Sequence, residues 1–209
     1  MKRGKFITFE GGEGAGKSTQ AHRLAARLEA EGRQVVLTRE PGGSTVAERL
    51  RDLVLAEKPH EPVAEFLLFA AARAEHLTAT IKPALRGGAW VICDRFIDST
   101  RVYQGDAGGI DPALIRLVEQ HTVAPWIPDL TLVMDLAPEV GIARARSRGA
   151  TNRYDEAALT LHTTLRRGFR RIAQEEPGRC VLVDASAGED AVAHAIWDAV
   201  TSRLLAGAH

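Results

Sequence analysis

A glycine-rich segment that follows an apolar run near the start of the chain limits the possible folds more than any other feature. The sequence KFITFEGGEGAGKST, from Lys5 to Thr19, contains the pattern G-x-x-x-x-G-K-[ST] between Gly11 and Ser18. Glycines allow backbone N–H groups to turn toward a phosphate, while the lysine adds positive charge and the serine hydroxyl can bind Mg²⁺. The motif stands between a predicted strand and a predicted helix, whose positive end would face the same anion. We therefore predict a nucleoside triphosphate site formed by Gly11, Gly12, Glu13, Gly14, Ala15, Gly16, Lys17, Ser18 and Thr19.

Short apolar runs and longer segments with helical features alternate along the chain. The runs are continuously apolar, which is typical of parallel strands that helices cover on both faces. The predicted strands are Lys5–Glu10, Gln34–Thr38, Trp90–Asp94, Leu130–Asp135 and Cys180–Asp184. The predicted helices are Thr19–Glu31, Thr45–Leu55, Pro62–Leu85, Pro112–His121, Pro138–Arg148, Asp155–Glu175 and Glu189–Leu205. No repeat or linker divides the sequence, so we expect residues 1–209 to form a single α/β domain. It should be a three-layer α/β/α P-loop fold with a five-stranded parallel sheet and ligands at the carboxyl ends of the strands.

The charge balance argues against several classes of function. The 209 residues contain 27 lysines and arginines and 27 aspartates and glutamates, so no global charge attracts nucleic acid or an acidic membrane. No apolar run approaches the length of a membrane span. The start of the chain is predicted as a strand rather than a signal peptide. We therefore expect a cytoplasmic enzyme that acts on small molecules.

The third predicted strand ends in Asp94-Arg95-Phe96, and this ending narrows the class of nucleotide-binding protein. Motors and helicases usually carry a second carboxylate here to position water, whereas this chain carries an arginine. A planar guanidinium matches paired phosphate oxygens, so an arginine at this place suits a second phosphate. A switch GTPase would need a guanine-reading N-K-x-D motif, which the sequence lacks. The pattern favours a kinase whose acceptor is already phosphorylated, and a surface ion pair is the alternative role for Arg95.

Further blocks of sequence point to one family. They are FEGGEGAGKST (Phe9–Thr19), TREPGG (Thr38–Gly43), LLFAAARAEH (Leu67–His76), DRFIDSTRVYQG (Asp94–Gly105), PDLTLVMDL (Pro128–Leu136), RARSRG (Arg144–Gly149) and NRYDE (Asn152–Glu156). Together they resemble the bacterial thymidylate kinases, from Lys5 to about the final helix. The phosphate-binding loop alone says little about the substrate, but TREPGG combined with DRF…ST…YQG is specific. The resemblance implies transfer of the γ-phosphoryl group of ATP to dTMP with Mg²⁺, in a homodimer.

The phosphoryl transfer itself can be assigned to residues. Lys17 and the loop backbone should hold the donor phosphates, with Mg²⁺ bound through Ser18 and, by way of water, Asp94. The second pKa of the acceptor monophosphate is about 6, so it is mostly a dianion at neutral pH and no general base is required. The difficulty is the repulsion between two anions that must approach each other. Arg95 is expected to bind the acceptor phosphate and to reduce this repulsion.

An arginine-rich lid is expected over residues 144–156. On a helix, Arg144 and Arg148 fall on one face, while Arg146 points elsewhere. By the resemblance, Arg148 and Arg153 are expected to act in catalysis beside Lys17 and Arg95. A solvated basic face is the alternative role of this cluster.

Base recognition is expected on the long helix Pro62–Leu85. Phe69 and Arg73 are four residues apart and share one helical face. In the family an aromatic residue here stacks on thymine and an arginine donates to its O4 carbonyl. Arginine has only donors, so it favours thymine or uracil over cytosine, and ordinary core packing is the alternative role of Phe69. The resemblance places Glu13 at the sugar 3′-hydroxyl and Tyr103 against C2′. The remaining acceptor contacts are expected from Arg39, Ser99, Thr100 and Gln104, with Arg51 as a further candidate.

Three alternative functions are left open by the residues. A deoxynucleoside kinase would need a carboxylate base near a neutral 5′-hydroxyl, and Glu10 is the available candidate. An ATP-dependent ligase that activates a carboxylate would not need the pair Phe69 and Arg73. A regulatory module without turnover would not need Lys17, Asp94, Arg95 and an arginine-rich lid together.

Overall fold

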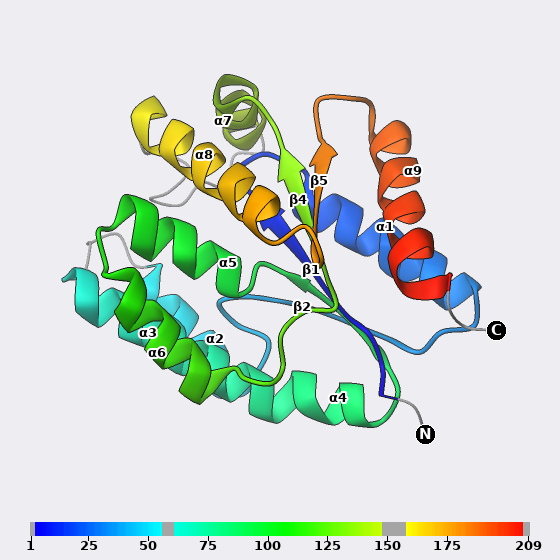
Figure 1. Cartoon of the computed structure of the whole chain (residues 1–209), viewed down its shortest axis with the longest axis horizontal. Helices are drawn as coiled ribbons and strands as arrows, with labels where there is room; N and C mark the ends of the chain where they lie inside the picture. Colours follow the sequence, from blue (N-terminus) through cyan, green and yellow to red (C-terminus); the bar gives the residue numbers. More distant parts are fainter. Residues whose placement is uncertain (1–2, 56–60, 148–157, 207–209) are drawn as a thin grey trace.

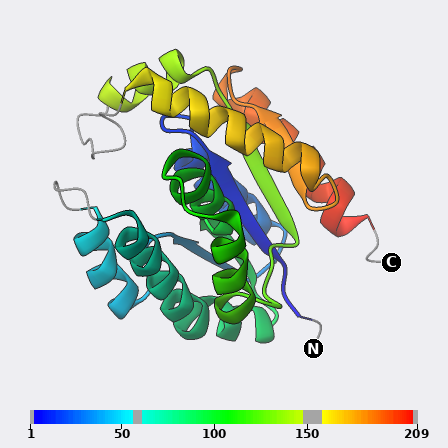
Figure 2. The same cartoon turned by 60° about the vertical axis from the view of Figure 1, so that its left-hand side comes forward.

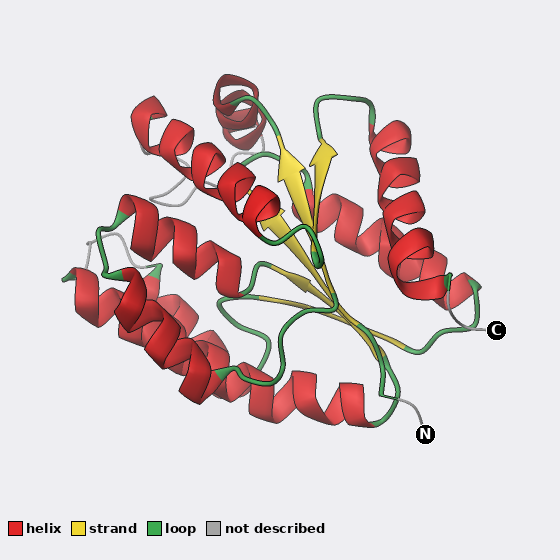
Figure 3. Cartoon of the chain, viewed as in Figure 1, coloured by secondary structure: helices red, strands yellow, loops and turns green. Residues whose placement is uncertain are grey.

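The fold is built on one parallel sheet. The computed structural model describes residues 3–55, 61–147 and 158–206 of the chain. Five strands form the sheet in the order β2-β3-β1-β4-β5, and all four pairings are parallel (Figures 1 and 3). The strands are β1 (Phe6–Gly11), β2 (Val35–Arg39), β3 (Trp90–Asp94), β4 (Leu130–Asp135) and β5 (Cys180–Asp184). The predicted sheet is confirmed, with each strand within one residue of its predicted bounds.

Helices connect these strands, and most of them match the prediction. The described α-helices are α1 (Lys17–Ala30), α2 (Thr45–Val54), α3 (Pro62–His76), α4 (Lys82–Arg86), α5 (Ile97–Thr100), α6 (Pro112–Thr122), α7 (Pro138–Ser147), α8 (Leu159–Glu175) and α9 (Glu189–Val200). Three π-helical stretches extend some of them: η1 (Leu77–Ile81), η2 (Arg101–Ala107) and η3 (Thr201–Leu205). Ser44 caps α2 by accepting the N–H of Ala47 at 3.3 Å, and Gly32, with φ 76°, follows the end of α1. These are the local signals that start and end helices.

Helical boundaries differ from the prediction in specific places. The helix predicted over Pro62–Leu85 is formed by α3, η1 and α4 in unbroken succession. The helical segment of α5 and η2, from Ile97 to Ala107, was not predicted. The expected end of one helix at Arg148 and the expected start of the next at Asp155 lie outside the described residues.

Helices cover both faces of the sheet. On one face Phe9 of β1 belongs to a buried cluster with Leu28 of α1 and Ile196 of α9. On the other face Phe6 of β1 packs with Leu77 of η1, and α8 lies against β4 and β5 on the same side. Figures 1 and 2 show the resulting three layers. Because both faces are covered, the carboxyl ends of the strands are the edge at which a ligand can meet several elements.

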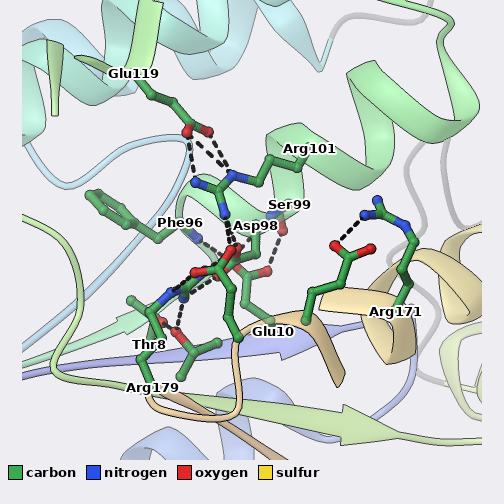
Figure 4. A network of polar contacts seen from close by, with 12 residues as sticks. Thr8, Glu10, Phe96, Asp98, Ser99, Arg101, Glu119, Arg171 and Arg179 are labelled. Atoms are coloured by element: carbon green, nitrogen blue, oxygen red, sulfur yellow. Dashed lines mark hydrogen bonds and ion pairs between the residues drawn. The ribbon is translucent and has the colours of Figure 1, made fainter. Parts of the chain in front are cut away.

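A buried ion-pair network joins the unpredicted helical segment to the sheet (Figure 4). Asp98 of α5 has no solvent exposure and receives two N–H groups of Arg179, at 2.7 and 2.8 Å. Arg101 of η2 contacts Asp98 at 3.3 Å and Glu119 of α6 at 2.8 Å. Arg179 also donates to Thr131 of β4 at 2.8 Å. These contacts hold α5 and η2 in place together with apolar packing by the buried side chains of Ile97 and Val102.

We expect Asp98→Ala to destabilise the folded protein by about 3–5 kcal/mol, because two arginines would lose a fully buried charge partner. Urea unfolding followed by circular dichroism measures the change. Asp190→Ala is the matched control, since Asp190 pairs with Arg23 at the surface, and it should leave the unfolding midpoint nearly unchanged. Equal effects of the two substitutions would contradict the structural role of Asp98.

Candidate functional site

The glycine-rich loop turns from β1 into α1 at the carboxyl edge of the sheet. Gly14 has φ 69° and lies so close to α7 that an added Cβ would be 2.0 Å from the carbonyl oxygen of Gly141. Gly16 has φ 83° and is the residue before the first turn of α1. Both conformations favour glycine. The loop thus presents backbone N–H groups and the start of α1 to the same space, as an anion site requires.

Lys17 and Ser18 begin α1 beside the end of β3. Lys17 is buried, and its Nζ donates to the carbonyl oxygen of Gly12 at 2.7 Å. Burial, with repulsion by Arg95, lowers the pKa of Lys17 from its usual value. The hydroxyl of Ser18 donates directly to the carboxylate of Asp94. A hydroxyl and a carboxylate are hard oxygen ligands, which suit Mg²⁺.

The described residues contain no cluster of three or more His, Cys, Asp or Glu side chains that could hold a metal. At phosphate sites proteins bind Mg²⁺ through one or two side chains together with water and substrate oxygens. The Ser18 hydroxyl and the Asp94 carboxylate have the chemistry of such ligands.

Arg95 has an unusual backbone and a paired side chain. Its φ is 70°, a left-handed conformation that costs free energy in residues other than glycine. Its guanidinium donates to Glu13 at 2.7 Å and, at 3.2 Å each, to the Gly11 carbonyl and the Ser99 hydroxyl. It also lies 5.1 Å from the ring centroid of Tyr103. The alternative role of a surface ion pair does not describe Arg95, because its side chain is only 17 % exposed and lines a pocket.

Glu13 is the anionic partner at the centre of the pocket. Burial alone would raise its pKa, but the charges of Arg95 and Lys17 outweigh burial and lower the pKa to about 2. The hydroxyl of Tyr103 donates to the same carboxylate at 2.8 Å. Glu13 is therefore an ionised acceptor throughout the physiological pH range.

Arg73 of α3 is a buried side chain that lines the same pocket as Arg95. Its side chain is 5 % exposed, and it donates to Glu40 at 2.6 Å, to Thr100 at 2.9 Å and to the Phe96 carbonyl at 3.0 Å. These three contacts account for three of the five N–H groups of a guanidinium. Phe69, one turn earlier on α3, is half-buried and lines the same pocket. The alternative of ordinary core packing therefore does not describe Phe69.

One pocket brings together most of the residues predicted from the sequence. It is lined by Glu13, Gly14, Ala15, Gly16, Lys17, Ser18, Arg39, Phe69, Arg73, Asp94, Arg95, Ser99, Thr100, Tyr103 and Gln104, as well as by Glu40, Pro41, Arg51 and Leu55. Arg39 lies at the rim, half exposed, with Glu48 at 3.1 Å. Gly11, Gly12 and Thr19 do not line this pocket, and Arg148 and Arg153 lie outside the described residues. The described part of the predicted site is thus largely contiguous.

Glu40 is a pocket residue that the sequence pattern did not single out. It is 5 % exposed, and its two carboxylate oxygens bind Arg73 and His76, the latter at 3.0 Å. The signal was present, because Glu40 lies inside the TREPGG block and directly follows β2. Its partners are more than thirty residues away in the sequence, so their pairing could not be seen from local pattern.

Glu10 does not have the access that a catalytic base needs. Its pKa is raised to about 7, chiefly by burial and also by Asp98. However, Glu10 has no solvent exposure and does not line the pocket. Its carboxylate accepts the N–H groups of Phe96 and Ser99 and the Ser99 hydroxyl. This arrangement argues against the deoxynucleoside kinase alternative.

The pocket brings the glycine-rich loop together with Arg95, which is a second cationic side chain. The same pocket is lined by the aromatic ring of Phe69 and by Arg73, which Glu40 holds in place. This fold and site define a P-loop phosphotransferase that acts on a second small molecule. The family model described as thymidylate kinase matches residues 9–196, and the chain belongs to the thymidylate kinase family. It is an enzyme of that family.

Thymidylate kinases from several bacteria are similar to this chain over nearly its whole length. A thymidylate kinase of a Bradyrhizobium species is 53% identical over 207 residues, covering 97% of this chain and 92% of the relative. One from Caulobacter vibrioides is 51% identical and covers 98% of this chain and 99% of the relative. The crystal structure of the Ehrlichia chaffeensis thymidylate kinase is 36% identical, with a TM-score of 0.78, covering 95% of this chain and 99% of that one.

The pKa of Glu13 predicts a pH dependence of stability. Since its folded pKa of about 2 lies below the unfolded value of 4.5, ionised Glu13 stabilises the fold above pH 4.5, and this contribution is lost as the pH falls toward 2. The unfolding free energies of the wild type and Glu13→Gln should therefore converge as the pH is lowered from 6 to 3. Urea titrations at several pH values measure the difference. A constant difference across this range would contradict the role of the ionised carboxylate.

Proposed function

We propose that this chain transfers the γ-phosphoryl group of ATP to dTMP, giving dTDP and ADP for dTTP synthesis, with Mg²⁺ as the metal. The observation that carries the proposal is the single pocket that contains the phosphate-binding loop, Arg95 and the pair Phe69 and Arg73. Membership of the thymidylate kinase family supports the choice of substrates. The ligase and the regulatory module are not favoured, because neither needs this combination in one pocket.

The donor side of the reaction uses the loop and the start of α1. Backbone N–H groups and Lys17 bind the ATP phosphates, and the contact of Lys17 with the Gly12 carbonyl uses only one of the three N–H donors of its ammonium group. Ser18 and, by way of water, Asp94 would hold the magnesium ion, which would supply positive charge to the phosphate oxygens. The direct hydrogen bond between Ser18 and Asp94 supports this assignment, because it shows that the two side chains are neighbours.

The acceptor side uses Arg95. An incoming phosphate competes with Glu13 for its guanidinium, and the N–H group that now faces Glu13 becomes a ligand for phosphate oxygens, while the contact with Ser99 is kept. The acceptor dianion attacks without a general base, because it carries no proton that must be removed. Positioning and charge stabilisation then supply the catalysis. We assign Arg148 and Arg153 to the same charge stabilisation, from a lid over residues 144–156.

The nucleoside of dTMP is placed by the remaining pocket residues. Phe69 stacks on thymine, and a remaining N–H of Arg73 donates to O4. Glu13 accepts the 3′-hydroxyl, and Tyr103, held by its hydrogen bond to Glu13, leaves no room for a 2′-hydroxyl. The outer contacts are assigned to Arg39, Ser99, Thr100 and Gln104.

We further propose that the chain acts as a homodimer. Val46 of α2, Val63 and Leu67 of α3 and Leu117 of α6 are between 41 and 52% exposed. Helix α3 packs against both α2 and α6, and all three lie on the same side of the sheet (Figures 1 and 2). Exposed apolar side chains on neighbouring helices mark an association surface. A second copy of the chain is the partner that the family resemblance supports.

The chain as a whole is proposed to be one kinase domain over residues 1–209 that works in the cytoplasm, where nucleotide synthesis supplies both substrates. The family model spans 9–196, which supports one domain. Among the described residues, no helix is long and apolar enough to cross a membrane.

We expect magnesium-dependent ADP release from ATP when dTMP is present, and much less with dCMP, UMP or thymidine. Lys17→Ala should lower kcat by roughly 10²–10³-fold, because a charge on the transferring phosphate is lost. Lys82→Ala on α4 is the matched control, since Lys82 does not line the pocket. Turnover of thymidine alone would move the protein to the nucleoside kinases, and turnover without any acceptor would contradict the proposal.

The dimer has its own test. Leu67→Glu places a charge in the proposed interface and should convert the protein to a monomer in analytical ultracentrifugation. Val140→Glu, on α7 and 42% exposed, is the control and should leave the sedimentation coefficient unchanged. A wild-type chain that sediments as a monomer would contradict the homodimer.

A further inference from the structure

Glu10 is a buried carboxylate that no step of the proposed reaction uses. It is the fifth residue of β1 and lies behind the pocket wall, with no solvent exposure. One of its oxygens accepts the N–H groups of Phe96, at 2.8 Å, and Ser99, at 3.2 Å. Its other oxygen accepts the hydroxyl of Ser99 at 2.6 Å (Figure 4). All of these donors belong to the segment that directly follows Arg95.

Arg95 depends on that segment in two ways. Its backbone is left-handed, with φ 70°, and is held by a hydrogen bond on each side. The N–H of Arg95 donates to the Phe9 carbonyl oxygen at 2.9 Å, and the next N–H, that of Phe96, donates to the Glu10 carboxylate. Its guanidinium donates to the Ser99 hydroxyl oxygen at 3.2 Å. Because that hydroxyl gives its proton to Glu10, its lone pairs remain available to Arg95. The chain of contacts therefore runs from Glu10 through Ser99 to the guanidinium.

We propose that Glu10 is a positioning residue, which fixes the backbone and the guanidinium of Arg95 for the acceptor phosphate by binding Phe96 and Ser99. This rests on the proposed function, because it takes Arg95 as the acceptor-phosphate ligand. An ionised carboxylate suits this role because both of its oxygens act only as hydrogen-bond acceptors. The three groups that face them, the N–H of Phe96 and the N–H and hydroxyl of Ser99, are all donors. Glutamine offers one acceptor and one donor, so it cannot satisfy all three.

The charges around Glu10 make this role depend on pH. Burial, then Asp98, raises the pKa of Glu10 to about 7, whereas Ser99, Arg95 and the Phe96 N–H act in the opposite direction. Asp98 is itself held by Arg101 and Arg179. The other titratable groups that interact with Glu10 are Lys17 on α1, Cys93 on β3 and Cys180 on β5. A protonated Glu10 resembles glutamine, because one oxygen becomes a donor.

The test compares wild type, Glu10→Gln and Glu119→Gln by steady-state kinetics with dTMP and ATP at pH 8 and pH 6. We expect Glu10→Gln to lower kcat/KM for dTMP about 10- to 100-fold at pH 8, the scale of a misplaced positioning group. KM for ATP should change little. The loss of kcat/KM for dTMP relative to wild type should be several-fold smaller at pH 6, because Glu10 of the wild type is then largely protonated. Protonation of the dTMP phosphate at pH 6 affects both enzymes equally. Glu119→Gln, a buried partner of Arg101 outside the pocket, should keep the kinetic constants.

Thermal unfolding separates positioning from mere structural support. The folded pKa of Glu10 is raised above 4.5, so its ionisation opposes folding as the pH rises through about 7. The Tm deficit of Glu10→Gln relative to wild type should therefore be smaller at pH 8 than at pH 6, whereas its activity deficit should be larger at pH 8. A lower Tm with loss of activity toward both substrates would overturn the proposal, as would kinetic constants equal to wild type at pH 8.

Ser99→Ala provides a second route that does not require Glu10→Gln to fold. It should lower kcat/KM for dTMP in the same direction, and the double variant should be no worse than the poorer single variant, because both remove one chain of contacts. Fully multiplicative effects would overturn the relay through Ser99. If wild type fails to phosphorylate dTMP, the proposed function itself is wrong, whereas an active wild type matched by Glu10→Gln contradicts only the role of Glu10.

Discussion

The ion pair between Arg95 and Glu13 joins the two halves of the pocket. It links the carboxyl end of β3 to the phosphate-binding loop after β1, and it sets two other charges. Arg95 and Lys17 repel each other in a buried space, which helps to lower the pKa of Lys17, and both cations keep Glu13 ionised. Without Glu13, these two buried cations would lose the anion that acts most strongly on both, with Asp94 and Glu10 left as weaker partners. The pair therefore reduces the free-energy cost of burying these charges before any phosphate enters the pocket.

The same balance explains how the pocket can accept two phosphorylated molecules. Among the described residues its lining carries five cationic side chains and three carboxylates, Glu13, Glu40 and Asp94. Each carboxylate has a distinct neighbour: Arg95 for Glu13, Arg73 for Glu40 and Ser18 for Asp94. Under the proposed function, phosphate oxygens would take the place of Glu13 at Arg95, and a magnesium ion would be held at Ser18 and Asp94, while the buried pair of Glu40 and Arg73 would stay intact. Binding would thus exchange partners at two places and leave the contacts of Arg73 unchanged.

Much of this arrangement is predictable from sequence because the strands are buried on both faces. Continuous apolar runs located all five strands, and the glycine pattern located the loop. The segment of α5 and η2 escaped because Asp98 and Arg101 are held there by ion pairs with Glu119 and Arg179, which lie far away in the sequence. Glu40 escaped for the same reason. The local sequence pattern predicts which apolar residues are buried. It does not predict buried ion pairs, because their partners come together only when the chain folds.

Asp98 and Glu10 show how neighbouring buried carboxylates can serve different ends. Asp98 is matched by two arginines, so its charge is compensated and its contacts hold helices to the sheet. Glu10 receives only backbone N–H groups and a hydroxyl at hydrogen-bond distance, so burial dominates and raises its pKa to about 7. A carboxylate kept only for stability would be better placed beside a cation or replaced by an apolar residue. The cost of burying Glu10 is understandable if what it holds, the strained backbone and side chain of Arg95, is required for the reaction.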